Sequence, residues 1–186
     1  ITNSPTFSTC SDIGFNIPLT SNILSTFSWI IGTTTGSITG ASDDAGTAIN
    51  QVLTNPSNAT SGTVQYIVTP GSTLGCTGSS FTITVTVNPT PEVTNSPTVT
   101  MCSGLGPNII LTSSTPSTFS WTIGAITGGI TGASASSGGI INQVLTNPSN
   151  TTSGTVQYIV TPISLAGCTG PSFSITVTVN PAPLVT

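Results

Sequence analysis

Four carboxylates and four thiols are the side chains of this sequence that could carry chemistry. The chain of 186 residues has no Lys, Arg or His, and its acids are Asp12, Asp43, Asp44 and Glu92. Two facing carboxylates hydrolyse glycosides, and Asp12 with Glu92 is the pair to consider. A Ser or Thr nucleophile would need a neighbouring base such as His or Lys. Because that base is missing, we expect no enzymatic activity.

The sequence is one unit written twice, and this bears on every candidate site. Cys10 recurs as Cys102, and the phrase at residues 49–58 recurs at 141–150. The step is 92 residues without a gap, and 64 of the 92 aligned positions are identical. This period is too long for a solenoid repeat but suits an autonomous domain of about 100 residues. We therefore expect a tandem array, of which this chain shows two units.

The acids are not repeated, which argues against a role common to both units. Asp43 and Asp44 offer oxygen ligands for Ca²⁺, but their counterparts are Ala135 and Ser136. The counterparts of Asp12 and Glu92 are also uncharged, so the second unit has no acid. A solvated loop explains the Asp43–Asp44 pair equally well. We expect no metal ion and no cofactor.

Each unit holds two cysteines that are 66 residues apart. The absence of a CxxC motif and of His argues against zinc. Paired cysteines in a β-repeat array are typical of extracellular proteins. We therefore expect a disulfide within each unit, Cys10–Cys76 and Cys102–Cys168. The alternative pairing, Cys76–Cys102, would join the two units instead.

The near-absence of charge excludes several classes of partner. Charged residues make up 2% of the chain and the net charge is −4, whereas an ordinary soluble domain has about 25% charged residues. Nucleic-acid binding requires cations that displace counterions from phosphate. Anionic membrane surfaces also attract basic segments. We expect no nucleic-acid partner, and no apolar run is long enough to predict membrane insertion.

Alternating apolar and polar residues predict β-strands throughout. The alternation is clearest at residues 80–88 and 62–70, which are joined by a Gly- and Ser-rich turn and should form a hairpin. Five further strands are expected in the first unit, at residues 6–9, 15–20, 26–31, 37–42 and 48–54. No stretch shows sustained helical periodicity. Each unit is therefore predicted to be an all-β sandwich of about seven strands in two antiparallel sheets.

Large aromatic residues fall on the inward side of these strands. Trp29 and Trp121 alternate in phase with Phe and Ile, and Tyr66 and Tyr158 alternate with Val. A tryptophan can stack on a sugar, but this phase favours a place in the core. We therefore assign Trp29, Trp121, Tyr66 and Tyr158 to the two cores.

Proline-rich segments define the domain organisation. Residues 87–97 contain three prolines, at positions 89, 91 and 97, which favours an extended, semi-rigid connector. The predicted domains are 1–92 and 93–184, arranged end to end. Residues 183–186 echo residues 91–94, so residues 185–186 are predicted to start a further repeat.

Together, these motifs resemble the PKD-like repeats, which are immunoglobulin-like β-sandwiches. The resemblance rests on Cys10-Ser11, Phe27-Ser28-Trp29, residues 64–68, Cys76-Thr77-Gly78 and residues 81–87, with their counterparts in the second unit. It covers nearly the whole chain. Arrays of this kind are similar to those of very large bacterial surface adhesins, including the type IX-secreted adhesin filaments of gliding bacteria. The resemblance implies an extracellular module without catalytic residues.

Three functions are compatible with the sequence. The first is a stalk or spacer in an extracellular adhesin or filament that supports adhesion or gliding motility, with neighbouring repeats as partners. The second is a multivalent array that binds a surface polysaccharide through polar loops such as residues 54–58. The third is a self-assembling sheath, because a chain without Lys cannot protect its sheet edges with charge and lateral self-association follows.

Overall fold

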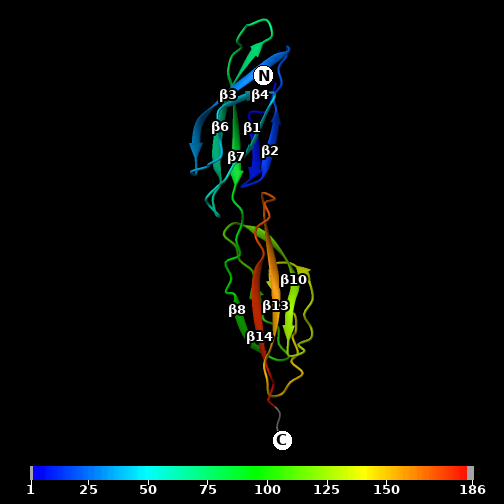
Figure 1. The fold of residues 1–186 in the computed structure, drawn as a ribbon. Coiled ribbons are helices and arrows are strands. Elements are labelled where there is room, and N and C mark those ends of the chain that lie inside the picture. Colours follow the sequence, from blue (N-terminus) through cyan, green and yellow to red (C-terminus); the bar gives the residue numbers. More distant parts are fainter. Residues whose placement is uncertain (1, 184–186) are drawn as a thin grey trace. The chain divides into compact units, whose positions relative to one another are not determined.

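The computed structural model describes residues 2–183 and confirms an all-β architecture of two tandem domains. The chain divides into Ile1–Thr90 and Pro91–Thr186, a boundary that falls within the proline-rich connector. The expected start of a further repeat at residues 185–186 lies outside the described residues. Each domain can be followed by its strand labels in Figure 1.

Seven strands form each domain over the described residues. Those of the first domain are β1 (Thr6–Cys10), β2 (Gly14–Pro18), β3 (Ser25–Thr35), β4 (Asp44–Gly46), β5 (Ala48–Val52), β6 (Gly62–Ser72) and β7 (Phe81–Asn88). Those of the second are β8 (Thr98–Cys102), β9 (Ile109–Ile110), β10 (Ser117–Thr127), β11 (Ser136–Ser137), β12 (Ile140–Ile141), β13 (Gly154–Ser164) and β14 (Phe173–Asn180).

A five-stranded sheet and a two-stranded sheet make up each sandwich. The larger sheets have the orders β1-β7-β6-β3-β4 and β11-β10-β13-β14-β8, and the smaller sheets are β2-β5 and β9-β12. The predicted hairpin is confirmed, since Gly62 pairs with Val87 and Val68 with Phe81 in antiparallel register. The expectation of purely antiparallel sheets is wrong, because β1 pairs with β7, and β8 with β14, in parallel.

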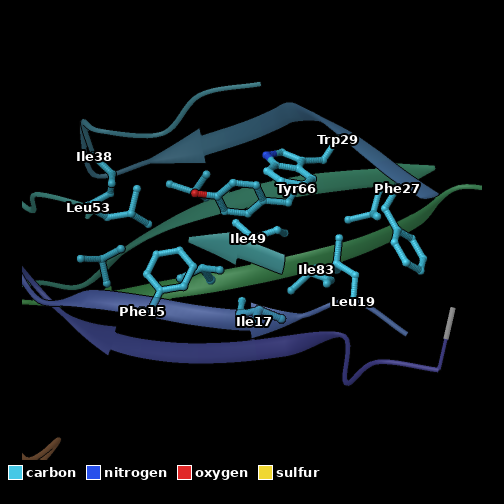
Figure 2. Close-up of a cluster of buried hydrophobic side chains, with 14 residues drawn as sticks. Phe15, Ile17, Leu19, Phe27, Trp29, Ile38, Ile49, Leu53, Tyr66 and Ile83 are labelled. Atoms are coloured by element: carbon cyan, nitrogen blue, oxygen red, sulfur yellow. The ribbon is translucent and has the colours of Figure 1, made fainter. Parts of the chain in front are cut away.

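The alternation of the sequence determines which side chains are buried. Along β6 the inward residues Val64, Tyr66 and Val68 have no exposed surface, while the residues between them are half-buried. Figure 2 shows Tyr66 and Trp29 of the larger sheet in one cluster with Phe15 and Ile49 of the smaller sheet. The second domain has its own core of the same kind. Each domain therefore has what it needs to fold as a unit.

One predicted strand is wrong, and the backbone shows why. Residues 37–42 were expected to form an edge strand, but Gly36 and Ser37 both have positive φ, at 71° and 54°. The chain turns there, and residue 39 makes only an isolated bridge to Thr54. The edge strand is instead the three-residue β4, which pairs with Phe27, Ser28 and Trp29 of β3.

The chain enters and leaves the first domain at opposite ends. At the entry end, the backbone N–H of Thr2 donates to the carbonyl of Thr20. At the exit end, the N–H of Ser11 donates to the carbonyl of Asn88, the last residue of β7. Entry and exit are thus separated by the length of the sandwich.

Candidate functional site

The carboxylate of Asp12 is held by hydroxyl groups of its own domain. It accepts hydrogen bonds from Thr54 (2.6 Å) and Ser11 (2.9 Å), and these two bonds lower the pKa of Asp12. Glu92 belongs to the second domain, where its N–H donates to the hydroxyl of Ser114 at 3.0 Å. Asp12 therefore stabilises the loop after β1. Nothing in these contacts favours a glycosidase pair of Asp12 with Glu92.

Asp43 and Asp44 bond to backbone amides. The N–H of Ile31 donates to Asp43 at 2.7 Å, and that of Ala45 donates to Asp44 at 2.8 Å. Ile31 lies where β3 shifts its register against β6, so Asp43 satisfies an amide at this irregularity. Among residues 2–183 no group of three or more His, Cys, Asp or Glu side chains could hold a metal ion. The two acids are thus placed as loop supports.

The aromatic residues assigned to the cores lie there. Trp29 and Trp121 are 4% and 5% exposed, and Tyr66 and Tyr158 have no exposed surface. Each indole N–H donates at 3.2 Å to a backbone carbonyl, that of Ser42 for Trp29 and that of Ser134 for Trp121. A buried indole has no face on which a sugar could stack, so these residues do not form a glycan platform.

Asn55, which was considered as part of a polysaccharide-binding loop, is instead an internal brace. It is 7% exposed, and its side-chain amide donates at 2.9 Å to the carbonyls of Thr60 and Val87. Its carbonyl oxygen accepts from the N–H of Ser57, also at 2.9 Å. Asn147 repeats this arrangement in the second domain. The loop is therefore tied to the end of β7 and cannot present Asn55 to a ligand.

We predict that Asn55→Ala destabilises the first domain by about 2–3 kcal/mol. The change removes two buried donors and leaves the carbonyls of Thr60 and Val87 without their partner, which costs more than a hydrogen bond contributes. Urea unfolding followed by circular dichroism measures the loss. Asn16→Ala is the matched control, because Asn16 is exposed on β2. Equal stability of the two variants would contradict the stabilising role of the Asn55 side chain.

Hydroxyl groups dominate the outer face of the larger sheet. Thr84 of β7 pairs with Thr6 and Gln65, and its neighbour Thr86 pairs with Ser8 and Thr63. Paired residues on adjacent strands share a face. Hydroxyls of this sheet also bond to one another, as between Thr63 and Thr35 at 2.9 Å. The face is uncharged and rich in donors and acceptors.

The expected disulfides within each domain are wrong. Cys10 and Cys168 are disulfide-bonded, whereas Cys76 and Cys102 carry free, exposed thiols. The Cys10–Cys76, Cys102–Cys168 and Cys76–Cys102 pairings are therefore all absent. Within the part of the chain that is described, each domain therefore has one free, exposed thiol.

The parallel strand explains why a bond within a domain cannot form. Cys10 ends β1 opposite Asn88, at the last residue of β7. Cys76 lies in the hairpin that precedes Phe81, the first residue of β7. The eight residues of β7 are seven steps from end to end, which is about 23 Å at roughly 3.3 Å per step. A disulfide needs Cα atoms about 4.4–6.8 Å apart.

Several solved structures match most of the chain at low sequence identity. Chicken VE-cadherin EC1-2 is 12% identical with a TM-score of 0.42, and the match covers 97% of this chain and 98% of that chain. The fibronectin(III)-like modules of Clostridium thermocellum CbhA are 11% identical with a TM-score of 0.35, covering 100% and 95%. A segment of three titin immunoglobulin domains is 9% identical with a TM-score of 0.36, covering 96% and 63%. No curated protein sequence matches the chain.

Two copies of one family model account for most of the chain. The PKD-like domain model matches residues 7–91 and again residues 99–183, one copy in each domain. PKD-like domains are generally extracellular structural or adhesion modules and are typically non-catalytic. Within residues 2–183 no helix has the length and apolar character of a membrane span. By its sequence and its fold, this chain belongs to the PKD-like domain family, as a tandem pair.

Proposed function

We propose that the chain is a force-transmitting spacer in the stalk of an extracellular adhesin or filament, and that it supports surface adhesion or gliding motility. The parallel pairing of the first and last strands carries this proposal. Five residue pairs, from Thr6–Thr84 to Cys10–Asn88, join β1 to β7. A pull on the two ends of the domain would slide these strands past each other. In this shearing geometry all the hydrogen bonds between β1 and β7 must break together. Strands that are pulled apart from one end lose their hydrogen bonds one at a time, which requires less force.

The second domain repeats this device. Five pairs, from Thr98–Thr176 to Cys102–Asn180, join β8 to β14. The chain also has no Lys or Arg, and therefore no cleavage site for trypsin-like proteases. Both properties suit a module that transmits force outside the cell. Neighbouring repeats of the same kind are its proposed partners.

The hydroxyl face and the strand edges are where a polysaccharide or a second chain would bind. The face is uncharged, but its hydroxyls already bond to one another at Thr35–Thr63 and Thr69–Ser80. The outermost strands are short, with five residues in β1 and three in β4, and short edge strands limit pairing between chains. These features favour the spacer over the binding array and the sheath.

We predict that Thr9→Pro lowers the force at which the first domain unfolds. The N–H of Thr84 donates to the carbonyl of Pro5, just before β1, and the N–H of Ser11, just after β1, donates to the carbonyl of Asn88 at the end of β7. Because strand amides alternate in direction, the N–H of Thr9, two residues before Ser11, also points toward β7. Proline has no amide hydrogen to donate, so it removes one hydrogen bond of the ladder. Single-molecule force spectroscopy measures the effect, with the unchanged second domain as the internal reference.

Thr9→Ala is the matched control, because it removes the same side chain but keeps the amide. Its first domain should unfold at the natural force. An equal loss of force in both variants would show that the side chain, not the ladder, carries the load. An unchanged force in Thr9→Pro would remove the main support for the spacer.

A further inference from the structure

The cysteines of the two domains form two structural types. Cys10 and Cys102 are the strand-end cysteines, which close β1 and β8 opposite Asn88 and Asn180. Cys76 and Cys168 are the hairpin cysteines, which lie between the last two strands of each domain. Every domain therefore has one cysteine type at its exit end and the other at its entry end.

One cysteine of each type is disulfide-bonded. Cys10 is a strand-end cysteine and Cys168 is a hairpin cysteine, and both are disulfide-bonded. The two free thiols are the remaining members, the hairpin cysteine Cys76 and the strand-end cysteine Cys102. Free and bonded members thus occupy equivalent positions in nearly identical domains.

The free hairpin cysteine already has the local structure of the bonded one. The N–H of Ser72 donates to the carbonyl of Cys76 at 2.8 Å, and that of Ser164 donates to the carbonyl of Cys168 at 2.9 Å. The glycine before each hairpin cysteine has a φ of 84°. Cys76 is exposed whereas Cys168 is 1% exposed. The hairpin backbone around Cys76 therefore needs no rearrangement to form a disulfide and requires only a second thiol.

The free strand-end cysteine is equally prepared. After Cys102, the N–H of Ser103 donates to the carbonyl of Asn180 at 2.9 Å. After Cys10, the N–H of Ser11 makes the same bond to Asn88 at the same distance. The two strand ends differ in whether the thiol is bonded, not in their backbone.

We propose that Cys76 and Cys102 each form a disulfide with a further copy of the repeat, so that disulfides link successive PKD-like repeats. Cys102 bonds the hairpin cysteine of a following copy of this repeat, and Cys76 bonds the strand-end cysteine of a preceding copy. The inference rests on the spacer array proposed above, and the recognised partner is a further copy of the same domain. Such bonds would carry load alongside the peptide connector, since each joins the exit end of one repeat to the hairpin of another.

The step requires an oxidant, for which a low-molecular-weight disulfide such as oxidised glutathione suffices. A thiolate attacks one sulfur of the oxidised glutathione and releases one reduced glutathione. The second protein thiol then attacks the mixed disulfide and releases another. Two protein thiols lose two protons and two electrons, and one glutathione disulfide becomes two thiols.

Two single variants test the proposal. Cys76→Ser keeps only the strand-end thiol of Cys102, and Cys102→Ser keeps only the hairpin thiol of Cys76. Each is incubated in a glutathione redox buffer, alone and mixed with the other, then quenched with iodoacetamide and separated on a non-reducing gel. Both positions are exposed, so we expect the variants to fold, and circular dichroism is the check. Peptic peptides identify the bonds, because trypsin has no site in this chain.

We expect the mixture to give about tenfold more covalent dimer than either variant alone, joined through Cys102 and Cys76. Homodimers as abundant as heterodimers would overturn the proposal, as would the absence of dimers. In the unmodified protein, iodoacetamide should label Cys76 and Cys102 but not Cys10 and Cys168. Labelling of Cys10 and Cys168 would also overturn it. These outcomes do not depend on the unfolding force, so a failed linkage is distinguishable from a failed spacer.

Discussion

Replacement of Trp29 by Ala is expected to split the unfolding of this protein into two transitions. The two domains share most of their sequence and have separate cores, so the natural chain should unfold over one narrow temperature range. Trp29 is 4% exposed and donates its indole N–H to the carbonyl of Ser42. Truncating a buried Trp to Ala costs about 3–5 kcal/mol. The first domain should then melt at least about 12 °C below the second.

Differential scanning calorimetry measures this separation. Leu74→Ala is the matched control, because Leu74 is 91% exposed in the hairpin of the same domain and its removal leaves no cavity. Trp121→Ala should give the mirror result, with the second domain melting first. A single transition shifted as a whole in the Trp29→Ala variant would show that the two domains unfold as one cooperative unit.

The fold was predictable because its information is local. A strand half-buried in a sandwich shows its inward residues every second position, and β6, β7 and their counterparts keep this rule over their whole length. The exact repeat then gave the number of domains. The strand at residues 37–42 failed for a local reason too, since its alternation is interrupted by the positive φ of Gly36 and Ser37. The alternation of apolar and polar residues does not reveal that a non-glycine residue such as Ser37 has a positive φ.

The cysteine pairing depends on topology, which alternation does not encode. The pattern shows that Cys10 belongs to the first strand and Cys76 to the last hairpin, but not at which end of the sandwich each lies. The parallel pairing of β1 with β7 decides this and separates the two sulfurs by the length of a strand. A first strand parallel to the last is incompatible with a disulfide between Cys10 and Cys76.

The role of Asn55 was hidden for a related reason. Polar loop residues are usually exposed, and a run of Thr, Asn, Pro and Ser is typical of a binding loop as much as of a brace. Only the folded chain shows that the side-chain amide reaches the carbonyl of Val87 from 32 residues away. The signal available in the sequence was the unbroken identity of residues 49–58 with residues 141–150. An identical loop indicates a shared constraint but not its kind.

Because the chain has few acids, we expect its stability to depend only weakly on pH in the acid range. The hydroxyls of Thr54 and Ser11 lower the pKa of Asp12 from its ordinary value. A lowered pKa contributes stability above the unfolded value, and this contribution is lost as the pH falls through the folded value. Asp12 is exposed and has no counterpart in the second domain, where Gly104 stands. Acid should therefore affect the first domain weakly and the second domain less.

Alkaline pH should destabilise both domains strongly. Burial raises the pKa of Tyr66 and of Tyr158 from 10.0 to about 12, because the phenolate would lose its hydration inside the core. Between these values the unfolded chain has released a proton that the folded chain keeps. Stability is therefore fully present below pH 10.0 and falls as the pH rises toward about 12. The loss is about 2–3 kcal/mol for each domain.

The measurement follows tyrosinate absorbance and far-ultraviolet circular dichroism in one titration, with Cys76 and Cys102 alkylated beforehand to prevent thiol exchange. Below about pH 12, tyrosine ionisation should appear only together with loss of sheet signal, because the buried phenols keep their protons up to that pKa. The double variant Tyr66→Phe and Tyr158→Phe is the control. It keeps both rings but loses the hydrogen bonds to Gln51 and Gln143, so it should start less stable and then hold that stability as the pH rises. Tyrosine ionisation in a domain that keeps its full sheet signal would place these phenols within reach of water and refute the prediction.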